Sequence, residues 1–302
     1  MSAISWIAVD WGTTQLRAWG LTPQNEVLYK GSSPQGMGSI KPHEFESVLL
    51  HLIADWLVPD QQTIVIACGM VGARQGWVEA PYMTVPCQAT GELVMAPTSD
   101  PRLRVYICPG AMQTDPADVM RGEETQIAGI LAQMPEFKGM VCLPGTHTKW
   151  AYIADGIIRS FTTFMTGELF SLLGRQSVLS HSVMTAEFAM EAFQRAVGDI
   201  SASPSLLAAK LFAIRSNDIL FHHSAAQSRA ELSGLLIGAE LQAVTSYYLG
   251  DDDIIILGSD SLAHLYRDGL SAMGKTSTLV PGEAFTLFGL QQAYHLLQQR
   301  SI

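Results

Sequence analysis

Two segments of the chain follow the same order of local patterns, and this repetition restricts the fold more than any other feature. Residues 4–30 read ISWIAVDWGTTQLRAWGLTPQNEVLYK, and residues 139–163 read GMVCLPGTHTKWAYIADGIIRSFTT. Each gives an apolar strand, a turn of the Gly-Thr-x-Thr type, a second strand, a polar turn and a third strand. The order of elements and the turn chemistry indicate an internal duplication. The chain is therefore expected to form two related domains, divided near 135–140.

The length supports this division, because 302 residues exceed the ~100–200 residues of an average domain. We predict an N-terminal domain at 1–138 and a C-terminal domain at 139–302. β-Branched and apolar runs predict strands at 5–9, 15–21, 26–30, 64–68, 104–108, 139–143, 150–153, 157–163 and 253–257. Helical periodicity appears at about 43–57, 123–133, 167–180, 185–197, 204–213, 227–249, 260–273 and 283–299. The pattern predicts an α/β fold in which each domain has a mixed sheet with flanking helices, and residues 81–103 a loop or edge insertion.

Composition excludes several classes of function. The formal net charge of −10 and the lack of a Lys/Arg cluster disfavour binding to nucleic acid or anionic membranes. The apolar runs are shorter than the ~18 residues of a membrane span, and no secretory leader is recognisable, so we expect a cytoplasmic protein. Its four cysteines form no C-x-x-C pair, which favours buried reduced thiols over a metal or redox site. The sequence does not fix the oligomeric state, and a homodimer is compatible with it.

The two Gly-Thr turns have the chemistry of phosphate-binding loops. In the first, Asp10 ends the strand and could hold a hydrated Mg²⁺, while the turn offers backbone N–H groups and hydroxyls to an anion. The second turn repeats this chemistry and adds Lys149. The candidate nucleotide-binding residues of the two turns are Asp10, Gly12, Thr13, Thr14, Arg17, Gly145, Thr146, His147 and Thr148. For the first turn alone, an ordinary hairpin capped by Asp10 is the alternative interpretation.

A third string, GLSAMGKT at residues 269–276, fits the Walker A pattern but has the wrong context. A P-loop requires a strand before it and a helix after it, whereas here a helical pattern precedes the string. We interpret its glycines as helix stops.

At the level of whole motifs, the chain resembles a known family. The two turns and IIILGSDSLAHLYRDGL at 254–270 are similar to the phosphate-1, phosphate-2 and adenosine motifs of the actin-like ATPase and sugar kinase superfamily. More narrowly, WIAVDWGTTQLRAW, ACGMVGARQGW, ADVMRGEETQIAGIL, LPGTHTKW and FMTGELFSLL resemble the 2-keto-3-deoxygalactonokinases, in the same order along nearly the whole chain.

The resemblance implies a two-domain actin-like (ribonuclease H-like) fold with ATP and Mg²⁺ between the lobes. It also implies transfer of the γ-phosphate of ATP to the 6-hydroxyl of 2-dehydro-3-deoxy-D-galactonate, a small sugar acid. Gly258 and Ser259 would contact the adenosine. Phosphoryl transfer needs positioning, Mg²⁺ and charge neutralisation rather than a covalent enzyme intermediate, so the residues are compatible with it.

The proton acceptor departs from the superfamily pattern. Such kinases usually place an aspartate about twenty residues before the phosphate-2 turn, but here that position falls on Glu123 and Glu124. Both are candidate bases, since a helix N-terminus would keep a glutamate ionised. A capping box explains either residue equally well. Asp118 is the reserve candidate, and Lys149 is a candidate catalytic cation.

A carboxylate substrate calls for an arginine clamp, and Arg74 lies in a glycine-rich loop beside Trp77 and Glu79. Arg121 is the other candidate, and Gly167 with Glu168 could also face the substrate. A solvated surface arginine and a helix cap are the respective alternatives. For the whole chain, the alternatives are a kinase for another small sugar or sugar acid, and a nucleotide-dependent binding module of the same fold.

Overall fold

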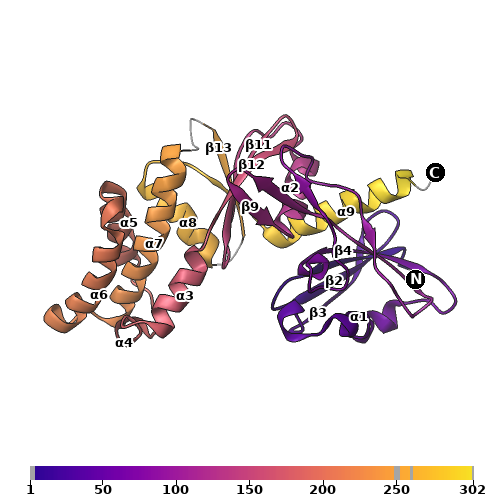
Figure 1. Ribbon diagram of the computed structural model, residues 1–302, viewed down its shortest axis with the longest axis horizontal. Coiled ribbons are helices and arrows are strands. Elements are labelled where there is room, and N and C mark those ends of the chain that lie inside the picture. Colours follow the sequence, from indigo (N-terminus) through magenta and orange to yellow (C-terminus); the bar gives the residue numbers. More distant parts are fainter. Residues whose placement is uncertain (1–3, 248–251, 259–260, 301–302) are drawn as a thin grey trace. The chain divides into compact units, whose positions relative to one another are not determined.

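The computed structural model describes residues 4–247, 252–258 and 261–300. The chain forms two compact units (Figure 1). Unit 1 consists of residues 1–137, 153–160 and 282–302, and unit 2 consists of residues 138–152 and 161–281. The chain first passes from unit 1 to unit 2 between residues 137 and 138, and residues 282–302 group with unit 1.

The main sheet of unit 1 has the strand order β3-β2-β1-β4-β7-β6. The β1–β2 and β2–β3 pairs are antiparallel, while β1–β4 and β4–β7 are parallel. β1 and β4 are apolar on both faces and are almost wholly buried, as expected for central parallel strands. The strands are β1 Trp6–Trp11, β2 Leu16–Leu21, β3 Val27–Ser33, β4 Thr63–Gly69, β6 Val94–Met95 and β7 Leu103–Ile107.

Helices of unit 1 cover this sheet. α1 (Phe45–Ile53) buries Phe45, Leu49 and Ile53 in the same apolar core as β1 and β4. α9 (Gly282–Arg300) lies on the core that contains Trp6, where the Tyr294 ring stacks on the indole with centroids 4.4 Å apart.

α2 (Glu123–Gln133) and α9 pack backbone to backbone. A Cβ on Gly129 would lie 1.9 Å from the Phe285 carbonyl oxygen, and one on Gly289 would lie 1.8 Å from the Thr125 carbonyl oxygen. Only glycine permits this approach, which explains why the C-terminal helix belongs to unit 1. The same contact fixes the N-terminal part of α2.

A second, smaller sheet in unit 1 has the order β5-β8-β9. It consists of β5 Tyr82–Thr84, β8 Gly110–Thr114 and β9 Ala117–Met120. β5 and β6 are short strands inside the region 81–103 that the sequence predicted as a loop or edge insertion.

Unit 2 is built on the sheet β12-β11-β10-β13-β14. Its strands are β10 Gly139–Leu143, β11 Thr148–Ala154, β12 Ile157–Phe164, β13 Asp253–Leu257 and β14 Thr278–Val280. The order 3-2-1-4-5 is the same as in the main sheet of unit 1 up to β7, and β10–β13 and β13–β14 are parallel like their counterparts. The duplication predicted from the two segments is thus present in the topology.

Unit 2 also carries a group of helices, drawn in pink to orange in Figure 1. Among them, α5 and α7 make the most extensive contact, where a Cβ on Gly234 of α7 would lie 2.5 Å from the Phe193 carbonyl oxygen of α5. The helices are α3 Thr166–Gln176, α4 Ser180–Val183, α5 Met190–Ala202, α6 Leu207–Phe221, α7 Ala225–Tyr247 and α8 Ser261–Ala272.

The α/β prediction, with mixed sheets and flanking helices, is confirmed. α6 ends eight residues later than its predicted limit at 213, because the helix continues through the polar run RSND at 215–218. No single helix in the described ranges is long and apolar enough to cross a membrane; the consecutive segments Met190–Ala202 and Pro204–Phe221 reach that length only together, and a 112° bend separates them.

Candidate active site

Asp10 lies at the carboxyl end of β1 in unit 1, where parallel sheets commonly place functional groups. Its Oδ2 atom accepts a hydrogen bond of 2.6 Å from Nη2 of Arg17 on β2, and its Oδ1 atom lies 4.0 Å from Sγ of Cys68. Burial raises the pKa of Asp10, and the neighbouring Arg17 guanidinium opposes that shift. Arg17 thus serves first as the partner of this carboxylate.

The turn after β1, residues 12–15 (turn 1), is exposed at Thr13 and Thr14. The Gly12 N–H closes the turn on the Gln15 carbonyl at 2.9 Å. The Gly12 and Thr13 carbonyls accept N–H groups from residues 37 and 38 at 3.0 and 2.9 Å. The carbonyls therefore face their own chain, while the two threonine side chains remain open to a ligand.

The N-terminus of α2 lies beside the end of β4. Gly69 and Gly122 both have positive φ, +90° and +108°, and a Cβ on Gly122 would lie 3.2 Å from the Gly69 Cα. Glycine is required at both positions for conformation and space. This close approach brings the first residues of α2 next to Cys68.

Glu123 and Glu124 open α2 and both turn back onto the preceding backbone. Glu123 Oε2 accepts the Arg121 N–H at 2.9 Å, and Glu124 Oε2 accepts the Gly122 N–H at 2.7 Å. Glu124 Oε1 also accepts the Thr125 hydroxyl at 3.0 Å. Both carboxylates thus bind backbone N–H groups of the two residues before the helix, and no capping box forms, because Gly122 at the N-cap has no side chain to complete one.

The two glutamates differ in environment. Glu124 is only 1% exposed, whereas Glu123 is half-buried. Burial, and then the charge of Glu123, raises the pKa of Glu124 from 4.5 to about 8. Asp10 and Glu124 both act electrostatically on Cys68, after its burial, to raise the pKa of that thiol. These two carboxylates thus belong to one cluster at the carboxyl end of the sheet, and a carboxyl with this perturbation is a candidate acid or base.

The predicted substrate residues on the loop after β4 lie in different environments. Arg74 and Glu79 are exposed on it. Trp77 instead packs against Trp11 and Phe45, and its Nε1 atom donates to the Pro97 carbonyl at 3.0 Å. The indole therefore anchors the loop.

Arg121 lies under this loop rather than on it, since it is 9% exposed. Its Nη2 atom donates to the Ala80 carbonyl at 2.8 Å, and its guanidinium lies 4.2 Å from the centroid of the Tyr82 ring. Its Nε and Nη1 atoms are buried without a hydrogen-bond partner among the described residues. Asp118 lies on β9, where its Oδ1 atom accepts the Val119 N–H at 2.7 Å.

In unit 2, the turn between β10 and β11, residues 144–148 (turn 2), is fixed by the start of α3. A Cβ on Gly167 would lie 2.3 Å from the Gly145 carbonyl oxygen, so glycine is required for this contact. The Glu168 N–H donates to the Thr146 carbonyl at 2.9 Å, and the Glu168 carboxylate bonds His147 Nε2 at 2.6 Å. Gly167 and Glu168, predicted at the substrate, thus hold turn 2.

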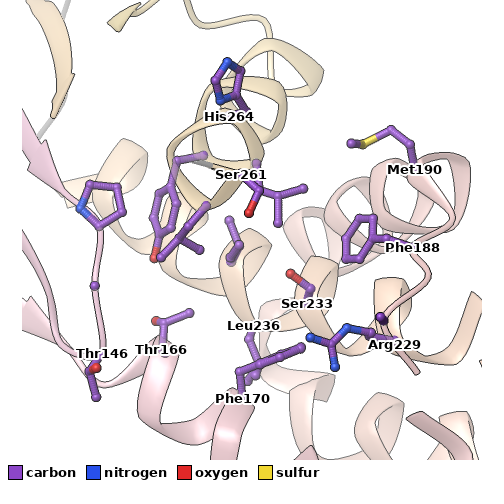
Figure 2. Close-up of a pocket in the computed structure, with 18 residues that line it drawn as sticks. Thr146, Thr166, Phe170, Phe188, Met190, Arg229, Ser233, Leu236, Ser261 and His264 are labelled. Atoms are coloured by element: carbon purple, nitrogen blue, oxygen red, sulfur yellow. The ribbon is translucent and has the colours of Figure 1, made fainter. Parts of the chain in front are cut away.

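A pocket of about 670 Å³ opens beside turn 2, entirely within unit 2. Gly145, Thr146 and Thr166 lie at one side, and Figure 2 shows Phe188, Met190 and Arg229 at the other. Leucine and isoleucine side chains from α7 and α8 form much of the remaining wall, with Ser261 and His264 of α8 as polar groups. The pocket is concave and mostly apolar with a few polar groups, as small-molecule sites are.

Behind the pocket wall lies a buried carboxylate, Glu240 of α7, which is 3% exposed. It accepts hydrogen bonds from Trp150 Nε1 at 2.7 Å, from Tyr266 Oη at 2.8 Å and from the Thr166 hydroxyl. Burial raises its pKa to about 7, against the effect of these donors. Glu240 was not among the residues predicted from the sequence. The feature that could have indicated it is a single acidic residue within the apolar run SGLLIGAEL, because a buried glutamate is rare unless it is paired.

The remaining predicted residues also belong to unit 2. Lys149 is buried, 6% exposed, and the alternation along β11 places it on the opposite face from Thr148 and Trp150. Gly258 follows β13, and its N–H donates to the Val280 carbonyl at 2.9 Å. Ser259 lies outside the described residues. Within the described ranges, no group of three or more His, Cys, Asp or Glu side chains is arranged to hold a metal ion.

Comparison with known proteins gives a consistent result. A family model for 2-keto-3-deoxy-galactonokinase matches residues 10–293. A probable 2-dehydro-3-deoxygalactonokinase of Rhizobium meliloti (strain 1021) is 38% identical over 294 residues, covering 95% of each chain. A 2-dehydro-3-deoxygalactonokinase of Escherichia coli (strain K12) is 33% identical, covering 96% of this chain and 97% of the relative.

Solved structures agree. A crystal structure of a protein described as a 2-dehydro-3-deoxygalactonokinase from Sinorhizobium meliloti aligns with a TM-score of 0.91 and 36% identity, covering 97% of this chain and 99% of the other. The activator of the 2-hydroxyisocaproyl-CoA dehydratase from Clostridium difficile, solved with bound ADPNP, aligns at 9% identity with a TM-score of 0.50, covering 98% and 97% of the two chains. The latter likeness concerns the fold alone, and the predicted actin-like ATPase and sugar kinase fold is confirmed.

Proposed function

The chain belongs to the 2-keto-3-deoxy-galactonokinase family, and from this premise we propose that it transfers the γ-phosphate of ATP to the 6-hydroxyl of 2-dehydro-3-deoxy-D-galactonate in galactonate breakdown. Apart from the family itself, the observation that carries the proposal is the pocket of unit 2. A largely apolar cavity of about 670 Å³ ends at a Gly-Thr turn. A nucleoside and its phosphates need these two environments side by side.

Unit 2 would bind the nucleotide. The apolar side chains of α7 and α8 suit the faces of the adenine ring, and Ser261 and His264 supply polar groups for its edge or for the ribose. The Gly145–Thr146 backbone at the pocket mouth would meet the phosphates.

Unit 1 would hold Mg²⁺ at Asp10, and the residues fit a hydrated ion. Mg²⁺ in phosphoryl-transfer sites keeps several waters and takes one or two carboxylates, so the single carboxylate at the end of β1 suffices. Arg17 binds Oδ2, and Oδ1, which has only the Cys68 thiol at 4.0 Å, would take a water of the ion. When bound, the ion supplies charge neutralisation on the phosphoryl oxygens.

The exposed loop after β4 would bind the sugar acid. Arg74 can form paired hydrogen bonds with a carboxylate, and Glu79 can accept from sugar hydroxyls. Arg121 and Trp77 hold this loop from below through the Ala80 carbonyl and the Trp11–Phe45 cluster. We therefore propose Arg74 as the clamp and Arg121 as a support of the loop.

For the transfer itself, we propose Glu124 as the proton acceptor. The O6–H proton passes to its carboxylate, a bond forms between O6 and the γ-phosphorus, and the bond from that phosphorus to the β,γ-bridging oxygen breaks to release ADP. A pKa of about 8 matches a base that works near neutral pH. Glu123 raises that pKa by its charge.

The test is ADP formation by the purified chain with Mg²⁺ and ATP against a panel of acceptors. The panel contains 2-dehydro-3-deoxygalactonate, 2-dehydro-3-deoxygluconate, galactonate, a neutral hexose and no acceptor. Preference for the first supports the proposal. Preference for another acceptor would keep the kinase chemistry but refute the proposed substrate. ADP formation at the same rate with and without each acceptor would favour a nucleotide-dependent binding module.

A further inference from the structure

Glu240 terminates a chain of hydrogen bonds that begins at turn 2. The Gly145 N–H donates to Thr148 Oγ1 at 3.4 Å, Thr148 Oγ1 lies 2.8 Å from Tyr266 Oη, and Tyr266 Oη lies 2.8 Å from Glu240 Oε2. Thr148, Tyr266 and Glu240 are each at most 3% exposed. No bulk water competes for these bonds.

The ionised carboxylate fixes the direction of every proton in this chain. A carboxylate only accepts, so the single hydroxyl proton of Tyr266 points to Glu240. Tyr266 must then accept from Thr148, and Thr148 is left to accept the Gly145 N–H. The Glu240 carboxylate of α7 thus orients the hydroxyls of Tyr266 and Thr148, and the Thr148 hydroxyl accepts the Gly145 N–H of turn 2.

The same carboxylate also holds the start of α3. Thr166, the first residue of that helix, donates its hydroxyl to Glu240 Oε2, and the next two residues contact turn 2. Trp150 Nε1 occupies the other oxygen at 2.7 Å. One buried carboxylate therefore connects β11, α3, α7 and α8, and residues of all but the strand line the pocket.

A role in the core alone does not account for this arrangement. Burying a carboxylate costs folding free energy, which is visible in the raised pKa of Glu240. An apolar side chain of similar volume would often be as stable or more stable at a buried site. What the carboxylate adds is a defined orientation of three polar donors, of which Thr166 and Tyr266 line the pocket.

We propose that Glu240 is a positioning residue that sets turn 2 and the first turn of α3 in the geometry that receives the nucleotide phosphates, acting through Tyr266, Thr148 and Thr166. This inference rests on the proposed function only in taking the pocket of unit 2 as the nucleotide site. It predicts that loss of the charge weakens nucleotide binding and leaves the sugar acid unaffected.

The experiment measures ADP binding by calorimetry at pH 8 for the wild type, Glu240→Gln and Tyr266→Phe. Glu231→Gln is the matched control, because Glu231 is a partly buried glutamate on the same helix that does not line this pocket. We expect at least a tenfold weaker ADP affinity for Glu240→Gln, a smaller loss for Tyr266→Phe, and no change for the control. In turnover assays, the KM for ATP should rise while the KM for the acid stays constant.

An ADP affinity within twofold of the wild type in folded Glu240→Gln would overturn the inference. If that variant does not fold, Tyr266→Phe decides, since it keeps the ring and removes only the hydroxyl; unchanged affinity there overturns the inference equally. Equal increases in both KM values would also contradict it. Tight ADP binding by a wild type that phosphorylates no acid would refute the proposed function and leave this inference intact.

Discussion

Replacing Glu124 by glutamine separates the catalytic and structural roles of the α2 N-terminus. The substitution keeps the size of the side chain and its ability to accept the Gly122 N–H through the amide oxygen, which in the wild type is a 2.7 Å bond to Oε2. It replaces the oxygen that accepts the Thr125 hydroxyl by an NH2 group, and it removes the capacity to take a proton near neutral pH. If Glu124 is the base, kcat should fall by about 10²–10⁴-fold, the usual contribution of a positioned general base.

The raised pKa gives this variant a second, independent signature. Burial raises the pKa of Glu124 from 4.5 to about 8, a shift worth about 5 kcal/mol at ~1.4 kcal/mol per unit. Because the folded-state pKa is the higher one, the native state favours the protonated form. The stability present below pH 4.5 is then lost as the pH rises through 8. Glu124→Gln should lack this loss and unfold at a higher temperature than the wild type at pH 9.

The assay is a pH–rate profile from 6 to 9.5 together with thermal unfolding at the same pH values. In the wild type, kcat/KM should rise with unit slope and level off near pH 8, because only the ionised carboxylate accepts a proton. Glu123→Gln is the matched control: it should keep the rising limb and move it to lower pH, since Glu123 raises the pKa of its neighbour. A Glu124→Gln enzyme that keeps wild-type rates and the same rising limb would refute the assignment.

Three further substitutions test the other residues. Asp10→Asn should fold normally and lower kcat at least ~100-fold even at saturating Mg²⁺, because it removes the charge facing the ion; a rate within threefold of the wild type would move the metal site elsewhere. Arg74→Ala should raise the KM for the sugar acid by about 10- to 100-fold through loss of charged hydrogen bonds, and the exposed Arg104→Ala in the same unit should not; equal KM values for the two would exclude the clamp. Gly167→Ala would place a Cβ 2.3 Å from the Gly145 carbonyl oxygen of turn 2. It should therefore destabilise the fold by about 1–3 kcal/mol and weaken ADP binding. Gly174→Ala on the same helix is the control, because the nearest atom to its Cβ would be a Val183 methyl at 3.6 Å. Equal unfolding temperatures for the two alanine variants would contradict the close packing.

Most strands of the two main sheets were predictable because their signal is local, whereas the small sheet β5-β8-β9 was not predicted. β1, β4, β10 and β13 are runs of apolar residues bounded by glycine, proline or polar turns, and the repeated turn chemistry indicated the duplication. β14 and β5 were missed because strands of three residues carry too little periodicity. The grouping of α9 with unit 1 depends on the contact of Gly129 and Gly289 with backbone atoms distant in sequence, which no local pattern reveals.

The residues of the candidate site show the same difference between local sequence signals and contacts distant in sequence. Turn 1, turn 2 and the glutamates of α2 were proposed as site residues because a Gly-Thr string or an acidic pair at the start of a helix has a chemical meaning by itself. The network of Glu240 joins residues up to 118 positions apart in its Thr148–Tyr266 bond, so only the folded chain brings it together. Trp77 was predicted beside the substrate from its place next to Arg74, and only the folded chain shows that its ring packs on Trp11 and Phe45.

The most direct test of the proposed activity is the identity of the product. The purified chain would be incubated with ATP, Mg²⁺ and 2-dehydro-3-deoxygalactonate and followed by ³¹P nuclear magnetic resonance. The account predicts one new phosphate monoester, coupled to the protons on C6 and formed in equal amount to ADP. Inorganic phosphate appearing with ADP, or a monoester at another carbon, would contradict it.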